Sequence, residues 1–449
     1  MKATFYTLGC KLNYAETASL ERQFQDRGFD IVPFQDQTDV CIINTCAVTE
    51  RAEREARQIV RRALRTSPNA YVVVLGCYAQ LGPEEIASID GVDLVLGASE
   101  KFRVFEYAGS FHKGAAPKIC VSDINQVNDF GPAYSGGADK RTRAFLKIQD
   151  GCDFNCAFCT IPLARGGSRS QEINSTVAQA IELVAMGYKE IILTGVNIGD
   201  YGKKDGFSFL ELLQQLDKID GLQRIRISSI EPNLLTDKVL DFWVSSKKIC
   251  HHFHIPLQSG TDELLKKMRR RYTSEHFKNL IYKIKEKSPN AGIGVDVIIG
   301  FPGETEELFE RNMEFLHTLP ISYLHVFTYS ERPNTPSISF PGRIEPRIRY
   351  AHSERMRNLG FMKKSSFYQS QLGSEHLVLI EGTIENNMLQ GFTENYIRVQ
   401  VPYYPSLENS IVKVRIDSFN GEVCDAVILS TVIDGVKSNE LFTTAVLAR

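Results

Sequence analysis

The chain has 449 residues, of which 43% are hydrophobic and 24% are charged, and its formal net charge is −2. These values are typical of a soluble globular protein of about three domains. No run approaches the roughly 18 apolar residues that a membrane helix needs, which excludes a helical membrane protein. The near-neutral charge gives no overall signal for nucleic acid, so any RNA site must depend on local basic patches.

The N-terminal stretch MKATFYTLGC enters an apolar run directly, without the layout of a signal peptide, so we expect a cytoplasmic protein. The chain has ten cysteines. Because disulfides are rare in the reducing cytosol, clustered cysteines in such a chain indicate metal binding or catalysis.

The first segment, residues 1–114, alternates short apolar runs with helical patterns. The apolar runs are typical of buried parallel strands and lie at 3–7, 39–44, 71–76 and 92–97. Helical patterns lie around 14–28, 49–65 and 83–89. This order predicts a doubly wound α/β domain. Residues 115–142 have weak periodicity, and we interpret them as a linker.

The second segment, residues 143–370, has a similar alternation of strands and helices. The expected strands lie at 145–149, 190–195, 224–230, 251–255, 294–300 and 323–329. Six βα units predict a partial parallel barrel, (β/α)6, because a closed barrel of this kind has eight. A long basic helix is expected over 343–370.

The third segment, residues 371–434, changes to a period of two. HLVLIEG, YIRVQV and IVKVRIDSF alternate apolar and polar residues, with Gly and Asn between them. This pattern predicts a small antiparallel β-barrel that resembles an OB-type module. Residues 435–449 are expected to form a C-terminal tail.

The stretch DGCDFNCAFCT places Cys152, Cys156 and Cys159 in a C-x3-C-x2-C spacing, directly after an expected strand. Structural zinc sites usually have a second cysteine pair or a histidine, and neither follows here. A cubane iron–sulfur cluster has four irons, each of which takes one outside ligand. Three cysteines would therefore leave one iron free to chelate a small molecule through an amine and a carboxylate. A zinc loop or a redox pair is the alternative.

This spacing after the first strand of a βα barrel resembles the radical S-adenosylmethionine (SAM) superfamily, and Phe158 also fits its signature. The resemblance implies that a reduced cluster cleaves SAM to methionine and a 5′-deoxyadenosyl radical. It also implies that strand ends facing the cluster hold SAM. The candidate contacts are Gly195, Asn197, Glu231, Gln258 and Gly300. Each of them could equally be an ordinary turn residue or a polar side chain that hydrogen-bonds within the protein.

Three isolated cysteines, Cys10, Cys46 and Cys77, each follow the end of an expected strand by one to three residues. Because the ends of adjacent parallel strands gather at one edge, these thiols could converge on a second open three-thiolate site. Any one of them could instead be a small buried hydrophobic side chain. We interpret the remaining four cysteines as structural: Cys41, Cys120, Cys250 and Cys424.

Eight motifs together resemble the methylthiotransferase family of radical SAM enzymes over nearly the whole chain. They are TLGCKLNYAE, INTCAVT, VLGCYAQ, IPLARGGSRS, RISSIEP, HFHIPLQSG, MRRRYT and DVIIGFPGET. The resemblance implies an N-terminal methylthiotransferase domain, a radical SAM core and a C-terminal RNA-binding TRAM domain. It also implies two [4Fe–4S] clusters, with Cys10, Cys46 and Cys77 holding the one that delivers sulfur. The motif sequences are most similar to those of the branch that acts on N6-threonylcarbamoyladenosine next to the anticodon of tRNA.

That branch would use two SAM molecules, one to methylate the sulfur and one to generate the radical that removes hydrogen from C2 of the adenine. Sister branches act on isopentenyladenosine in tRNA or on an aspartate of a ribosomal protein, and both remain alternatives. An alternative of another class is a non-catalytic RNA-binding sensor with a metal cluster. The expected partners are the tRNA anticodon stem-loop, SAM, a sulfur source and an electron donor such as flavodoxin or ferredoxin; we expect a monomer.

RNA phosphates would be contacted by local basic patches. The candidates are the helix at 343–364, the KKMRRRY run at 266–272, the arginines of the 49–65 helix, and the C-terminal Arg398, Lys413 and Arg415. Each patch could instead be an ordinary solvated face. His252 and His254 share one strand face, where we expect packing or substrate contacts.

Overall fold

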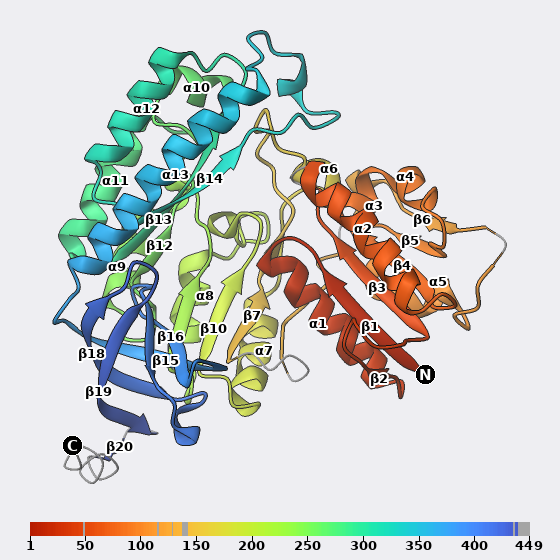
Figure 1. Ribbon diagram of the computed structural model, residues 1–449, viewed down its shortest axis with the longest axis horizontal. Coiled ribbons are helices and arrows are strands. Elements are labelled where there is room, and N and C mark those ends of the chain that lie inside the picture. The colour runs from red at the N-terminus through yellow and green to blue at the C-terminus, as the bar shows by residue number, and fades with distance from the viewer. Residues whose placement is uncertain (48–49, 115, 128, 137–141, 434–435, 439–449) are drawn as a thin grey trace.

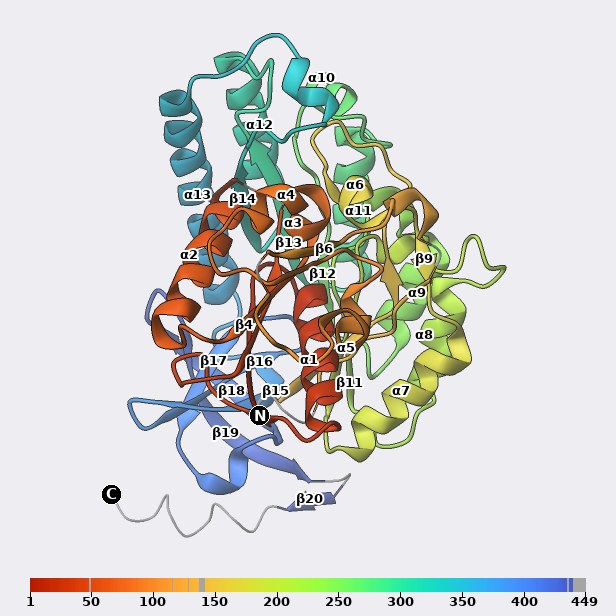
Figure 2. The same ribbon diagram turned by 90° about the vertical axis from the view of Figure 1, so that its right-hand side faces the viewer.

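A computed structural model describes all residues except 48–49, 115, 128, 137–141, 434–435 and 439–449 (Figure 1). The chain forms an N-terminal α/β unit, a central α/β unit with parallel strands, and a C-terminal β unit (Figures 1 and 2). No helix among these residues is long and apolar enough to cross a membrane.

The N-terminal unit contains a parallel six-stranded sheet in the order β2-β1-β3-β4-β5-β6. Its strands are β1 (Lys2–Thr7), β2 (Asp30–Ile31), β3 (Val40–Thr45), β4 (Tyr71–Gly76), β5 (Leu94–Leu96) and β6 (Lys118–Cys120). Its helices are α1 (Lys11–Gln25), α2 (Glu50–Thr66), α3 (Cys77–Leu81), α4 (Pro83–Ala87), η1 (Lys101–Arg103) and α5 (Val104–Ala108). The four expected strands and three expected helices are present. Their bounds shift by a few residues.

Helices cover both faces of this sheet. On one face, Leu20 and Phe24 of α1 pack against Ile42 of β3. On the other, Ile59 and Val60 of α2 pack against alternate residues of the same strands. Burial on both faces explains why β3 and β4 are continuous apolar runs, buried at every position.

The segment expected as a linker, residues 115–142, is partly folded. β6 (Lys118–Cys120) extends the first sheet, and η2 (Ile124–Gln126) follows it. Tyr134 forms an antiparallel bridge with Leu146 of β7. The linker interpretation was therefore wrong for these residues, because a three-residue edge strand is too short to have a detectable period. Residues 137–141 lie outside the described part of the chain.

The central unit has two parallel three-stranded sheets, β11-β10-β7 and β12-β13-β14. Parallel bridges between Ile225 and Ile249, and between Ser229 and His254, join the β11 and β12 regions. The strands are β7 (Arg143–Lys147), β10 (Glu190–Thr194), β11 (Arg224–Ile227), β12 (His252–His254), β13 (Gly292–Ile299) and β14 (Tyr323–Thr328). A short separate pair is formed by β8 (Gln149–Asp150) and β9 (Arg169–Ser170).

Most helices of the central unit lie outside these strands (Figure 1). The helices are α6 (Ile161–Arg165), α7 (Ile173–Ala185), η3 (Ile198–Asp200), α8 (Phe209–Asp217), η4 (Pro232–Leu234), α9 (Asp237–Ser245), α10 (Asp262–Lys267), α11 (Ser274–Lys287), α12 (Glu306–Thr318), η5 (Pro336–Ser339) and α13 (Pro346–Gln369). Val295 and Val297 of β13 pack into the core on the helix side. Because side chains alternate along a strand, Asp296 and Ile298 face the opposite, inner side.

The C-terminal unit contains β15 (Glu375–Glu385), β16 (Met388–Thr393), β17 (Arg398–Pro402), η6 (Pro405–Leu407), β18 (Ile411–Phe419), β19 (Cys424–Ile433) and β20 (Val436–Ser438). The sheet order is β17-β16-β15-β18-β19-β20, and an extra pairing between β17 and β19 joins five strands into a ring. Of the expected tail at 435–449, only β20 lies among the described residues.

Buried arginines hold the C-terminal unit against the central one. Arg226 of β11 forms an ion pair with Glu190 at 2.9 Å and donates to the Thr393 carbonyl at 3.0 Å. Arg224 donates to the Phe392 carbonyl at 3.1 Å. The charges of both arginines therefore serve this contact and do not face solvent.

Candidate active site

Cys10, Cys46 and Cys77 lie at the carboxyl edge of the first sheet, after the neighbouring strands β1, β3 and β4. Cys10 precedes α1, Cys46 directly follows β3, and Cys77 opens α3. The loops after β1 and β3 touch, since a Cβ added at Gly9 would lie 2.8 Å from the Cys46 Cβ and 3.1 Å from its Sγ. The structure thus brings together three thiols that are far apart in sequence.

Cys152, Cys156 and Cys159 lie in one loop between β8 and α6. The backbone N–H of Phe154 points at Cys152 Sγ, and that of Ile161 points at Cys159 Sγ, each at 3.4 Å. Burial raises the pKa of Cys152 to about 11 and that of Cys159 to about 12. Metal binding would have to displace these protons, which couples affinity to pH.

The two cysteine groups are neighbours in space. Thr160, directly after Cys159, donates its hydroxyl to the carbonyl of Ala47, directly after Cys46, at 3.4 Å. Helices α3 and α6, which follow Cys77 and Cys159, also contact each other. The contact between the N-terminal and central units is therefore flanked by cysteines from both sides.

The residues predicted to contact SAM divide into two sets. Phe158 and Gln258 line a cavity of about 170 Å³ together with Cys159, Ile298 and Phe327. Asn197 lies on the other side of the loop, where its Nδ2 is 4.0 Å from Cys152 Sγ and its buried Oδ1 has no partner among the described residues.

Gly195 precedes Asn197 and is packed tightly against a glutamine. A Cβ added there would meet the Gln149 side chain at 3.0 Å. The same Gln149 accepts the Asn197 backbone N–H at 2.7 Å and donates to the Gly151 carbonyl at 2.7 Å. Gln149 thus connects the predicted SAM contacts with the residue before Cys152.

Glu231 and Gly300 have specific partners of their own. Glu231 accepts a hydrogen bond from Arg270, whose other nitrogen lies 3.2 Å from Cys156 Sγ. Gly300 has a φ of +81°, and a Cβ there would lie 2.3 Å from Arg349 Cγ. Glycine is therefore needed at this position for packing as well as for backbone conformation.

Arg270 and Arg349 correct the interpretation of two basic patches. Arg270, from the 266–272 run, is directed at Cys156 and Glu231. Arg349, from the helix at 343–364, is buried and pairs with Glu331, while Arg355 pairs with Glu310 at 2.5 Å. Arg270 and Arg349 therefore serve internal contacts, and Arg355 lies in a surface ion pair.

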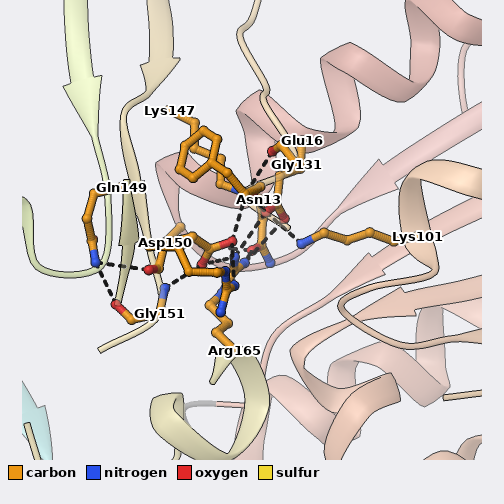
Figure 3. Close-up of polar contacts among 12 residues, drawn as sticks. Asn13, Glu16, Lys101, Gly131, Lys147, Gln149, Asp150, Gly151 and Arg165 are labelled. Atoms are coloured by element: carbon orange, nitrogen blue, oxygen red, sulfur yellow. Dashed lines mark hydrogen bonds and ion pairs between the residues drawn. The ribbon is translucent and has the colours of Figure 1, made fainter. Parts of the chain in front are cut away.

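A buried charge network joins the N-terminal and central units (Figure 3). The Arg165 guanidinium lies 3.0 Å from both Glu16 Oε1 and Asp150 Oδ1. Lys101 and Lys147 complete it: both approach Glu16, at 2.6 and 3.1 Å, and Lys147 also pairs with Asp150 at 2.7 Å. Glu16 and Lys101 belong to the N-terminal unit, whereas the other three belong to the central unit.

The network keeps its carboxylates ionised. Burial opposes ionisation of Glu16, but Arg165, Lys101 and Lys147 together hold its pKa well below the usual range. Lys147 and Arg165 do the same for Asp150. Since three cations face two carboxylates, the buried set has an excess positive charge beside the cysteines.

Lys147 and Asp150 lie just before Cys152, and Arg165 lies in the motif IPLARGGSRS, which contributed only to the family resemblance; none of the three was predicted from the sequence as a site residue. A lysine inside an otherwise apolar strand was the available signal, because a buried ammonium requires a carboxylate partner. The identity of that partner, Glu16, could not be inferred from the strand.

Comparison with known proteins supports the assignment of both units. A family model described as the radical SAM superfamily matches residues 146–316, and one described as uncharacterized protein family UPF0004 matches residues 2–97. The chain is 40% identical to threonylcarbamoyladenosine tRNA methylthiotransferase MtaB of Bacillus subtilis, over 92% of this chain and 93% of that protein. It is 38% identical to the Aquifex aeolicus protein of that name, over 93% of this chain and all of the other.

More distant relatives include the tRNA-2-methylthio-N(6)-dimethylallyladenosine synthase of Alkaliphilus oremlandii, at 31% identity over 93% of this chain and 91% of that one. Among solved structures, the radical SAM methyltransferase TsrM from Kitasatospora setae matches with a TM-score of 0.56 at 16% identity, over 75% of this chain and 77% of that one. This likeness concerns the fold alone. The chain therefore belongs to the methylthiotransferase family of radical SAM enzymes, together with the MtaB proteins, and its cofactors are SAM and [4Fe–4S] clusters.

Proposed function

We propose that this enzyme converts N6-threonylcarbamoyladenosine next to the anticodon of tRNA to its 2-methylthio derivative. The observation that carries the proposal is the contact between the two cysteine groups, through Thr160 and Ala47. A reaction that removes hydrogen and inserts sulfur at one carbon needs a radical source and a sulfur source side by side. The relatives at 40% and 38% identity carry a name that specifies this nucleoside.

The donor set fits two open cubane clusters. Cys152, Cys156 and Cys159 would hold the cluster that binds SAM, and Cys10, Cys46 and Cys77 would hold the second, so that each leaves one iron free for an exogenous ligand. The unpartnered Oδ1 of Asn197 beside Cys152 fits a polar ligand at the first site. When bound, the clusters and two SAM molecules supply the radical that removes the C2 hydrogen and the methylthio group that replaces it.

The protein's own residues would bind SAM and orient it. We propose that Phe158, Gly195, Asn197, Glu231, Gln258 and Gly300 surround SAM. The 170 Å³ cavity lined by Phe158, Gln258 and Cys159 supports this for two of them. The central strands would form a partial (β/α)6 barrel around the cavity, consistent with their order, and the N-terminal unit would be doubly wound.

The C-terminal unit would be the TRAM module that binds RNA. Its ring of five strands supports this. Two of the predicted phosphate contacts, Lys413 and Arg415, are exposed but also pair with Glu375 and Asp417, at 2.5 and 2.9 Å. The anticodon stem-loop would enter where the N-terminal, central and C-terminal units meet, and a tRNA substrate would place the enzyme in the cytoplasm.

Nucleoside mass spectrometry of tRNA from a deletion strain tests the substrate. We expect 2-methylthio-N6-threonylcarbamoyladenosine to disappear and to return with the wild-type gene. Loss of the 2-methylthio isopentenyladenosine derivative instead would favour that sister branch, and unchanged tRNA would favour the ribosomal protein aspartate. A metal-cluster sensor predicts iron binding without release of 5′-deoxyadenosine from SAM and dithionite.

Cluster number is tested by anaerobic reconstitution. Two cubanes correspond to about eight irons per chain, and we expect Cys10→Ala to retain about four together with SAM cleavage. Cys41→Ala is the matched control, because Cys41 is buried within β3 and is expected to leave the iron content unchanged. If the wild type itself binds only about four irons, the second cluster is rejected.

A further inference from the structure

Two histidines and an aspartate meet on one face of the sheet β12-β13-β14. His254 ends β12, Asp296 lies in β13, and His325 is the register partner of Asp296 on β14. Ile298 and Phe327, two residues further along β13 and β14, line the cavity of about 170 Å³. Because alternate residues of a strand share a face, the group of Asp296 and its two histidines begins about 7 Å along the strands from that cavity.

The donor atoms of these three side chains are spaced like the ligands of one metal ion. Asp296 Oδ1 lies 2.8 Å from His254 Nε2 and 3.4 Å from His325 Nδ1. All three donor atoms lie within 4.8 Å of one another. Bonds of about 2.1 Å in octahedral or tetrahedral geometry separate neighbouring ligand atoms by about 3.0–3.4 Å. Two of the three separations therefore already match a coordination sphere to within a few tenths of an ångström.

A second hydrogen bond fixes the ring of His254. Its Nδ1 lies 2.7 Å from the Ser229 hydroxyl, which leaves Nε2 directed at Asp296. Histidines that bind metals almost always engage their other ring nitrogen in this way, and the partner sets the tautomer and the ring orientation. His252, on the same strand face, differs: its Nε2 lies 2.7 Å from the Tyr323 hydroxyl, so it serves packing.

The group is anchored on one side and accessible on the other. The side chains of His254 and Asp296 are 14% and 15% exposed, whereas that of His325 is 51% exposed. Among the residues that the structure describes, no lysine or arginine forms an ion pair with Asp296. Two neutral imidazoles and one carboxylate carry a net negative charge, so the group favours a cation that arrives from solvent.

We propose that His254, Asp296 and His325 bind a divalent transition-metal ion through two imidazole nitrogens and one carboxylate oxygen. This donor set contains no thiolate and suits Mn²⁺, Fe²⁺, Co²⁺ or Zn²⁺, in contrast to the cysteine groups, which suit iron–sulfur clusters. Three protein ligands leave coordination positions open for water or for an oxygen donor of a molecule in the neighbouring cavity. The inference does not depend on the proposed function.

The test uses Mn²⁺ as the probe, because this hard ion prefers carboxylate and imidazole to thiolate. The reconstituted holoenzyme, with its clusters oxidised, is titrated with Mn²⁺, and the free ion is measured from its EPR signal. For the wild type we expect about one bound Mn²⁺ per chain, with pulsed-EPR couplings to ¹⁴N of coordinated imidazole. His325→Ala and Asp296→Asn should each weaken binding by about tenfold or more.

Asp296→Asn retains an oxygen that can accept hydrogen bonds from both histidines, so it removes the charge and spares the packing. His276→Ala is the matched control, because His276 is an exposed histidine of α11 and should leave Mn²⁺ binding unchanged. Urea midpoints without metal establish that every variant is folded. Wild-type affinity in folded His325→Ala and Asp296→Asn, or bound Mn²⁺ without ¹⁴N couplings, would show adventitious ions only and would overturn the metal site.

Discussion

Arg165 Nη2 donates a hydrogen bond to Asn13 Oδ1 at 2.6 Å, across 152 positions of sequence. Asn13 lies beside Cys10, whose Sγ is 3.8 Å from the same oxygen, and also holds the Leu8 and Thr45 carbonyls. Arg165 is the last residue of α6, the helix that follows Cys159. The carbonyl of the next residue, Gly166, accepts a hydrogen bond from the Cys152 backbone N–H at 3.0 Å. One guanidinium thus fixes the loops of both cysteine groups relative to each other.

Replacement of Arg165 by Met should destabilise the contact between the N-terminal and central units. Two buried carboxylates and Asn13 would lose their shared partner, which costs about 3–5 kcal/mol for a buried ion pair. The measurement is the urea midpoint of the unfolding transition, compared with Arg347→Met on the exposed face of α13, for which we expect a change within about 0.5 kcal/mol. Equal urea midpoints for the two variants would show that the network does not stabilise the contact between the units.

Substitution of Gly9 by Ala should prevent assembly of the proposed second cluster, at Cys10, Cys46 and Cys77, and leave the proposed first cluster intact. The new Cβ would lie 2.8 Å from the Cys46 Cβ, and the φ of +102° also disfavours alanine. Gly28→Ala is the control, because its φ of +79° gives similar strain with no atom within 4 Å. We expect reconstituted iron to fall from about eight to about four per chain only in Gly9→Ala, with SAM cleavage maintained. A full iron complement in Gly9→Ala would contradict the proposed packing requirement.

Arg270 should tune the reduction potential of the cluster that we propose Cys156 helps to hold. Hydrogen bonds to cysteine sulfur stabilise the reduced, more negative state of an iron–sulfur cluster. Loss of the 3.2 Å contact in Arg270→Gln should therefore lower the reduction potential, by ~60 mV for a bond of about 1.5 kcal/mol. An EPR-monitored redox titration measures this shift. The neighbouring, exposed Arg269→Gln should leave the potential unchanged, and an equal shift in both variants would indicate a general charge effect.

Glu304 should make the central unit less stable as the pH rises. Burial raises its pKa from 4.5 to about 7, despite the Gly300 N–H that it accepts at 2.8 Å. The folded state therefore penalises the ionised carboxylate: the penalty is absent below pH 4.5, grows as the pH rises to 7, and is constant above it. It amounts to about 3 kcal/mol at most.

Glu304→Gln, which keeps the acceptor for Gly300, should remove this penalty. We expect its urea midpoint to match that of the wild type near pH 4.5 and to exceed it at pH 8. Glu307→Gln, on the exposed face of α12, is the control and should follow the wild type at both values. A constant difference between Glu304→Gln and the wild type across this range would rule out the titration of Glu304.

Most of the elements, and the positions of the six candidate cluster cysteines relative to the strands, can be predicted from the sequence. Continuous apolar runs predicted β3 and β4, because parallel strands buried on both faces require them. The same reasoning predicted that Cys10, Cys46 and Cys77 meet at one edge, since adjacent parallel strands end together. Short edge strands such as β6 were not predicted, because three residues are too few to show the alternation of apolar and polar residues that identifies a strand.

Which charged side chains pair with each other could not be predicted before the fold was known. Arg270 belonged to a run that resembled a phosphate-binding patch, and the fold instead places it against Cys156 and Glu231. Two partners of Arg165, Asn13 and Glu16, lie more than a hundred residues away from it in sequence. Periodicity identifies a buried face because burial of apolar area is non-directional, whereas a buried charge is stabilised by specific atoms within a few ångströms, and these are defined only once the units have packed.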